Sequence, residues 1–181
     1  MGNRHFMDNQ IKEINKKIRN SVKNIEPLKG FEILAESMSY LVYDIFGRNT
    51  LLSILYQMGA GPGRKIANRL KEKYGKEQFK LFEATEIILK ELKEYYAIKI
   101  KDVERTEEKV RIVIENHCFL REPFKDREKL NFGKAFCRVN KGYFEVAYKE
   151  LLGDNIRNVK INFLKNNPEK DVCIEELIFY R

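Results

Sequence analysis

The residues of this sequence best suited to metal or redox chemistry are its cysteines and one histidine. The sequence has three cysteines, Cys118, Cys137 and Cys173, and His117 directly precedes the first of them. Thiolate and imidazole are ligands that zinc prefers, so these four side chains form a candidate metal set. No C-x-x-C pair is present, and the spacing alone favours the alternative that each cysteine is a small buried hydrophobic residue.

A glycine-rich run at residues 59–65, GAGPGRK, invites comparison with phosphate-binding loops. It fits neither the dinucleotide fingerprint nor the Walker loop, because the third glycine comes one residue early and Lys65 is followed by Ile66. Arg64 and Lys65 near a helix start would be the residues to hold an anion. The preferred interpretation is structural. Gly59 and Gly63 share one helical face with Ala67, which lets another element approach closely, and Pro62 predicts a kink or a helix restart.

Catalytic constellations are absent from the sequence pattern. His117 is the only histidine outside the first residues of the chain, and an adjacent Cys/His pair is not by itself a catalytic arrangement. Glu175 and Glu176 follow one another in a predicted strand, so their side chains point to opposite faces and do not form an acid/base pair. We therefore do not expect enzymatic activity.

Composition restricts the function classes further. The chain has 181 residues, 43% hydrophobic and 34% charged, which is enough for a core and for solubility. The net charge of +8 raises the question of nucleic acid, but the basic residues fall between apolar ones at helical spacing, as on a solvated helix face. No apolar run approaches the roughly 20 residues of a bilayer helix, and the first residues show no signal core. We expect a cytoplasmic protein with reduced thiols and no nucleic-acid partner.

The elements that position these residues follow from hydrophobic periodicity. Residues 9–23 predict an amphipathic helix, and residues 31–46 fit a helix, although 40–46 alone would also suit a buried strand. Gly47 breaks the pattern. Three further helices are predicted, at about 51–58, 66–74 and 77–95.

Alternation with a period of two then predicts a β-hairpin, with strands at 96–101 and 110–115. A bulky amphipathic helix follows around residues 132–151, and Gly153 lies where a left-handed C-cap belongs. A second hairpin, 159–164 and 172–180, ends the pattern. The prediction is an α+β fold with an antiparallel sheet of about four strands and helices packed on one face.

Large aromatic side chains on the 132–151 helix are candidates for the wall of an apolar cavity against the sheet. Most of them should belong to the core. The helix that contains Gly59 and Gly63 would close the cavity on its other side. With residues added by the resemblance described next, the predicted pocket set is Phe132, Phe136, Tyr143, Phe144, Tyr56, Gly59 and Gly63.

Two motifs in this order resemble the 4-vinyl reductase domain, also called the hydrocarbon-binding domain. Leu55-Tyr56-Gln57-Met58-Gly59 with Gly63-Arg64-Lys65-Ile66-Ala67 is similar to that family's L-Y-x-x-G-x-x-x-G-x-x-x-A helix. Residues 137–143, CRVNKGY, with the later LLG at 151–153, are similar to its Cys-helix-Gly segment, and a closing strand with Cys173 and Phe179 follows.

The resemblance spans about residues 47–179, which leaves 1–46 as an N-terminal helical extension of a domain at 47–181. It implies a fold related to subunits of the TRAPP vesicle-tethering complex, pairing as a homodimer, and an apolar small molecule bound between helices and sheet. Members that hold zinc add ligands on the terminal hairpin to the helix cysteine. Here Cys137 and Cys173 match, but residues 160–171 contain no second cysteine, so a complete site would recruit Cys118, His117 or Glu169.

The function expected from the sequence is therefore a non-enzymatic homodimeric binding module for a hydrophobic or aromatic small molecule or an acyl chain, acting as a sensor or a carrier. Two alternatives stay open. One is a protein-interaction or scaffold subunit, and the other is a thiol- or zinc-based redox sensor that uses Cys137 and Cys173.

Overall fold

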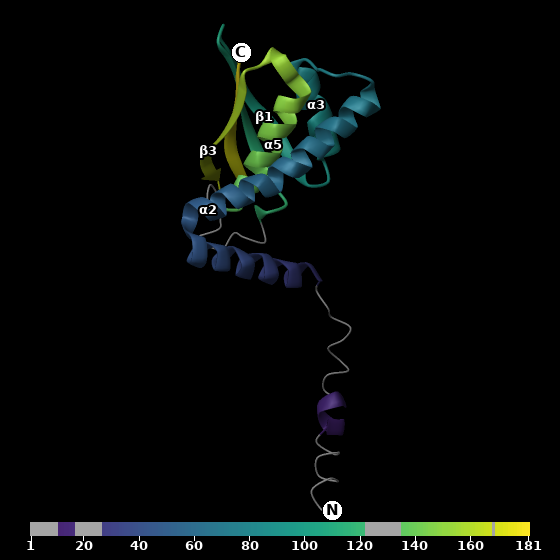
Figure 1. Ribbon diagram of the computed structural model, residues 1–181, viewed down its shortest axis with the longest axis vertical. Helices are drawn as coiled ribbons and strands as arrows, with labels where there is room; N and C mark the ends of the chain where they lie inside the picture. Colours follow the sequence, from purple (N-terminus) through teal and green to yellow (C-terminus); the bar gives the residue numbers. More distant parts are fainter. Residues whose placement is uncertain (1–10, 17–26, 122–134, 168) are drawn as a thin grey trace, which may run out of the picture. The chain divides into compact units, whose positions relative to one another are not determined.

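The computed structural model describes residues 11–16, 27–121, 135–167 and 169–181 (Figure 1). Contacts divide the chain into two units, Met1–Tyr40 and Leu41–Arg181. The first unit contains a helical stretch at residues 11–16, inside the predicted helix at 9–23, and the beginning of helix α2. The second unit carries the sheet and the core. Among the described residues, no helix is long and apolar enough to cross a membrane.

Helix α2 extends over Pro27–Tyr74, and its only non-helical backbone angles are at Gly47, with φ 78° and ψ 172°. Glycine tolerates this positive φ because it has no Cβ. The helix predicted at 31–46 and the break at Gly47 are confirmed. The sequence predicts a kink or a restart at Pro62, and the restart does not occur, because helical backbone angles continue through this residue. Gly61 lacks the Cβ that would clash with the proline ring, which lowers the local cost of Pro62.

Helix α3 spans Leu81–Glu91, shorter than the predicted 77–95. Gly75, with φ 61°, ends the preceding helix, and Phe79 is held by a hydrogen bond from its N–H to the Leu151 carbonyl at 2.9 Å. After Leu92 the chain turns, and the Tyr95 and Tyr96 N–H groups donate back to the Leu92 carbonyl at 2.8 and 2.9 Å. The first strand therefore starts at the end of a tight turn, which fixes the positions of both tyrosines.

The four strands are β1 (Tyr96–Arg105), β2 (Lys109–Cys118), β3 (Asn158–Asn167) and β4 (Val172–Tyr180). They form one antiparallel sheet in the order β1-β2-β4-β3, so the two hairpins join through β2 and β4. This confirms the predicted α+β class and the two hairpins. Buried and less buried residues alternate along β2 and β4, which leaves one face for the helices and a more polar opposite face.

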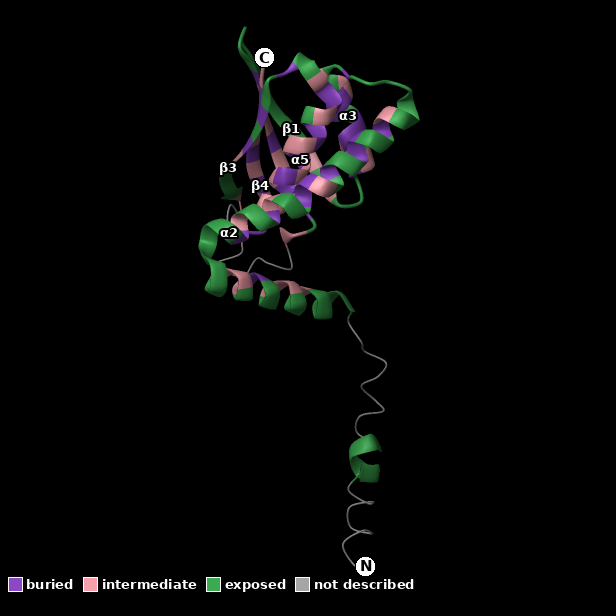
Figure 2. Cartoon of the chain, in the orientation of Figure 1, coloured by how far each residue is buried: buried purple, intermediate pink, exposed green. Residues whose placement is uncertain are grey.

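Helix α5 (Cys137–Leu152) crosses the inner face and is followed by a short 3₁₀ turn, η2 (Gly153–Asn155). Gly153 ends the helix with a positive φ of 55°, but its ψ of −130° is not that of the predicted left-handed C-cap. The Lys149 ammonium donates to the carbonyls of Gly153 and Ile156 at 3.0 and 2.6 Å, which caps the negative end of the helix. Figure 2 shows that buried residues are concentrated in α5 and in the strands beside it.

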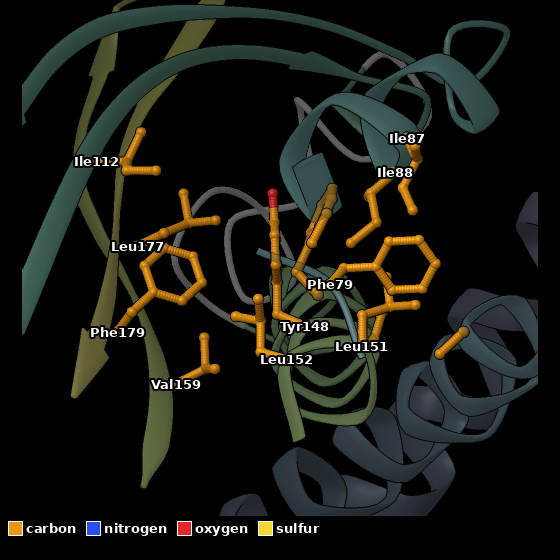
Figure 3. Packing of buried hydrophobic residues seen from close by; sticks show 14 of the residues in the cluster. Phe79, Ile87, Ile88, Ile112, Tyr148, Leu151, Leu152, Val159, Leu177 and Phe179 are labelled. Carbon is orange, nitrogen blue, oxygen red and sulfur yellow. The ribbon is translucent and has the colours of Figure 1, made fainter. Parts of the chain in front are cut away.

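The core lies between α5, the sheet and α3 (Figure 3). Tyr148, Leu151 and Leu152 of α5 are almost fully buried. They pack between sheet residues, among them Phe179 on β4, and the α3 layer, which includes Ile88. Each such side chain contributes about 1.5–3 kcal/mol of transfer free energy. This packing fills the centre of the space between α5 and the sheet.

Helix α5 also covers the edge strand β3. The Glu145 carboxylate accepts from the Ile161 N–H at 2.8 Å, and the Lys141 ammonium donates to the Ile161 carbonyl at 2.7 Å. The two side chains lie 3.1 Å apart as an i, i+4 ion pair. Because they satisfy backbone groups of an edge strand, they remove a surface on which another strand would pair.

Candidate ligand-binding site

Helices α2 and α5 touch backbone to backbone where they cross. A Cβ built on Gly59 would lie 1.9 Å from the Val139 carbonyl oxygen, and one on Gly63 would lie 2.4 Å from the Tyr143 carbonyl oxygen. The contact is reciprocal, because a Cβ on Gly142 of α5 would lie 2.1 Å from the Tyr56 carbonyl oxygen of α2. The predicted small-residue face is therefore the contact between the two helices.

A cavity of about 580 Å³ opens beside this contact. It is bounded by α2, the end of α3, the start of β1, the turn after β2 and the first part of α5. Its walls are mostly apolar or aromatic, and the lining residues are Met58, Gly59, Pro62, Lys65, Ile66, Arg69, Glu91, Leu92, Tyr95, Tyr96, Phe119, Val139 and Tyr143.

The predicted pocket residues are only partly brought together here. Gly59 and Tyr143 line the cavity. Phe144 lies in the core at 2% exposure, and Phe136 is also buried, but neither lines this cavity. Tyr56 and Gly63 contribute to the helix contact and not to the lining. Phe132 lies outside the described residues.

The cavity therefore lies beside the α2–α5 contact, with the Gly59 helix as one wall as the sequence suggested, and not against the core aromatic residues that α5 turns to the sheet. Phe144 and Tyr148 already fill the space toward the sheet, with ring centroids 6.5 Å apart. The residues that sequence reasoning missed are mainly Leu92, Tyr95, Tyr96 and Phe119. The adjacent tyrosines at the junction of helix and strand were the available signal.

An aromatic cluster forms one wall. The Tyr96 ring contacts Phe119 and Phe144 edge to face, with centroids 5.7 and 5.4 Å apart, and Tyr143 contacts Phe144 in the same way at 5.5 Å. Such pairs are favoured because the positive ring edge meets the negative face. The cluster links the cavity lining to the core and holds Tyr96 and Tyr143 in place.

The polar groups of the cavity are few and located at defined positions. The Tyr96 hydroxyl donates to the Asn140 Oδ1 atom at 2.8 Å, and burial raises the pKa of Tyr96. Burial also raises the pKa of Tyr143 to about 12, so its hydroxyl stays protonated at neutral pH. On the rim, Arg69 pairs with Glu91, whose second oxygen lies 3.7 Å from the Lys73 ammonium.

A buried polar cluster lies deeper, on the inner face of the sheet. Glu175 is 2% exposed, and the Asn116 side chain donates to it at 3.1 Å. Burial raises the pKa of Glu175 to about 7. The Asn116 Oδ1 atom has no hydrogen-bond partner among the described residues. Glu176, the next residue, pairs on the opposite face with Arg111 at 2.5 Å, which confirms that the two carboxylates do not act together.

The predicted zinc set is not assembled in the described part of the chain, where no three His, Cys, Asp or Glu side chains are placed to hold a metal ion. His117 faces the hairpin turn, with its Nδ1 atom 2.7 Å from the Asp171 carbonyl oxygen. Burial raises the pKa of Cys118, and it raises that of Cys173 to about 12. The Arg121 guanidinium lies 3.2 Å from the Cys173 sulfur. Burial therefore disfavours the reactive thiolate form of both free thiols at neutral pH. Cys137, on the first turn of α5, is intermediate in burial.

Comparison with known proteins gives structural likeness only. No family profile and no curated protein matches the sequence. Among solved structures, the phenol-responsive sensory domain of the transcription activator PoxR with phenol is similar, with a TM-score of 0.56 and 10% identity over 82% of this chain and 74% of that one. A trafficking protein particle complex subunit 3 from Naegleria fowleri, covalently bound to palmitic acid, is also similar. Its TM-score is 0.53 with 14% identity, over 84% of this chain and 94% of that one.

Proposed function

We propose that the Leu41–Arg181 unit is a non-enzymatic binding module that takes a hydrophobic or aromatic small molecule, or an acyl chain, into the cavity between α2 and α5. The observation that carries this proposal is the cavity of about 580 Å³, which falls within the usual range for small-molecule sites. Its apolar walls favour an apolar ligand, because burial of apolar surface is the main favourable term. In this proposal the module acts as a sensor or a carrier of the molecule that it binds.

The polar groups of the cavity specify the rest of the ligand. Pro62 has no N–H to donate to the Met58 carbonyl, and both residues line the cavity, so this carbonyl lacks its usual helical donor. Lys65 on the rim offers a positive charge. We therefore expect an apolar body with a single polar group, either a hydroxyl that donates to the Met58 carbonyl or an anion that pairs with Lys65.

The two structural neighbours support this ligand class. One holds phenol and the other palmitic acid, which are both apolar bodies with one polar end. Their identities to this chain, 10% and 14%, are too low to transfer any residue role. What they contribute is that this fold accommodates such molecules.

The binding experiment uses the purified full chain, with mass spectrometry under native and denaturing conditions and calorimetry with phenol and palmitate. Val139→Phe fills the cavity and should weaken binding of the ligand by at least tenfold. Val113→Phe, the same substitution on the opposite face of the sheet, is the matched control and should leave binding unchanged. Equal affinity of both variants and the wild type would show that the cavity is not the site.

We further propose that the full chain forms a homodimer through the part of α2 that precedes this unit. Leu28, Phe31, Leu34 and Met38 of α2 follow one another at helical spacing, and all are exposed. Such a stripe is the usual contact surface between helices of two chains. The same stripe would serve the alternative function, a scaffold subunit that binds a different protein. A monomer in light scattering at micromolar concentration, with a partner recovered from a lysate, would favour the scaffold.

A further inference from the structure

A second cavity of about 600 Å³ lies at the other end of the inner face of the sheet. The first cavity includes Tyr96, the first residue of β1, whereas the second includes Arg105, the last. The floor of the second cavity is apolar and consists of residues from five different segments, Phe79, Val110, Leu152, Ile156 and Phe179. Its rim includes three cationic residues, Lys80, Arg105 and Arg181.

The strand register explains why an arginine borders an apolar floor. Arg105 is paired with Val110, and Val110 is paired with Phe179. Directly opposed residues on antiparallel strands project to the same face of a sheet. Val110 and Phe179 are buried in the core, so Arg105 projects to the same inner face at the edge of the sheet. It lies beside the floor and not on the polar outer face.

Exposed apolar side chains continue from this floor along the edge. Val103 is paired with the buried Ile112, so it also belongs to the inner face, yet it is 41% exposed. Phe82, at the start of α3, lines the cavity and is 55% exposed. The inner face is therefore uncovered near the second cavity, and an apolar chain or ring would find contact surface on both sides of it.

Among the described residues that line this cavity, the cationic residues outnumber the acidic ones by three to one. Glu83, the one acidic residue of the lining, is engaged by an ion pair with Lys76. Glu104, which precedes Arg105 in β1, forms an ion pair with Arg111 on the outer face of the sheet, at 3.2 Å. Within the described residues, the side chains of Lys80 and Arg105 have no acidic partner within ion-pair distance. The Arg181 backbone is fixed by its N–H, which donates to the Glu108 carbonyl at 2.9 Å.

From the apolar floor and the excess of cationic residues, we propose that the second cavity binds an amphipathic anion, with its apolar chain or ring on the floor and its carboxylate at Lys80, Arg105 and Arg181. A carboxylate accepts charge-assisted hydrogen bonds from both amine and guanidinium groups, and arginine suits the bidentate form. This site is independent of the first cavity, and a fatty or aromatic carboxylic acid is the ligand class.

The test is methyl NMR of the full chain titrated with monomeric dodecanoate. Binding at the second cavity should shift the methyl signals of Val110, Leu152 and Ile156. Binding at the first would shift those of Ile66, Leu92 and Val139. Dodecanol and dodecyltrimethylammonium, which have the same chain without the anion, should bind the second cavity at least tenfold more weakly.

The double variant Lys80→Gln/Arg105→Gln should raise the dissociation constant for dodecanoate at the second cavity by tenfold or more. Lys93→Gln/Lys99→Gln removes the same charge from exposed positions outside the cavity and should leave the constant within twofold. Shifts confined to the first cavity, or equal binding of the three dodecyl compounds, would overturn the proposal. Failure of the first cavity to take any ligand would not affect the second set of methyl shifts, so the two proposals are tested separately.

Discussion

The contact between α2 and α5 predicts that Gly59→Ala destabilises the protein although alanine favours helices. The added Cβ would lie 1.9 Å from the Val139 carbonyl oxygen, whereas real contacts of this kind are not shorter than 3.0 Å, so the helices would separate by about 1.1 Å. The obstacle is backbone, which no side-chain rotation relieves, and we assign a cost of about 3 kcal/mol, the upper end of the usual range for overpacking. The helix-propensity gain offsets about 1 kcal/mol, which leaves a net loss of about 2 kcal/mol.

The assay is thermal and urea unfolding of the full chain by circular dichroism. A loss of about 2 kcal/mol corresponds to a decrease in Tm of about 4–8 °C for a chain of this length. Gly61→Ala is the control, since nothing lies within 4 Å of a Cβ at this position. There the helix gain is opposed by the clash of a Cβ with the following proline, so we expect a change below about 1 kcal/mol. If Gly59→Ala were as stable as Gly61→Ala, the backbone contact would not hold the two helices together.

Three further predictions concern the buried carboxyl, the thiols and the exposed helix. The folded pKa of Glu175, about 7, lies above its unfolded value of 4.5, so the folded state loses stability as pH rises between these values, by about 3 kcal/mol in full. Glu175→Gln should therefore be more stable than the wild type at pH 8 and equal to it below about pH 4, under the unfolded pKa, in urea titrations. Glu176→Gln should instead be less stable than the wild type at pH 8, because hydrogen bonds from Arg111 and Asn162 outweigh burial and lower the pKa of Glu176. Cys118 and Cys173 should react with a thiol reagent at pH 7 at least tenfold more slowly in the folded than in the unfolded chain, and equal rates would contradict their burial. Met38→Glu should convert a homodimer into a monomer in light scattering without changing the Tm of the Leu41–Arg181 unit, and a dimer that persists would place the interface elsewhere.

Periodicity was sufficient to predict most of the fold. The alternation in residues 96–101 and 110–115 predicted the first hairpin, and the structure places both runs inside β1 and β2. The order β1-β2-β4-β3 was not predictable, because no local pattern determines which strands of two separate hairpins pair. The local pattern at Pro62 does not predict the continuous helix, because the packing of α2 against α5 on both sides of this residue is a tertiary effect.

The candidate site was predicted less well, for a reason of packing. The aromatic residues of α5 were assigned to one pocket wall, but side-chain type alone does not separate a ring that lines a space from a ring that fills it. Phe144 fills the core, whereas Tyr143, the preceding residue, points to the cavity. The sequence predicts a loop after the second strand, where Phe119 lies, and no pattern predicts that this residue lines the same cavity as Gly59.

The same packing explains why there are two cavities and why each lies where it does. Gly59, Gly63 and Gly142 allow the backbones of α2 and α5 to touch. The first cavity opens beside this contact, where longer side chains of the two helices separate them from the turns next to β1 and β2. The large residues of α5, among them Tyr148 and Leu151, fill the middle of the inner face of the sheet, and α3 packs on α5 and not directly on the strands, so the end of β1 is left uncovered. The second cavity is the space left at that end. Because the described residues that line both cavities belong to helices, strands and the short turns between them, both cavities should be present in the protein before a ligand binds, and ligand binding should leave the α2–α5 contact unchanged.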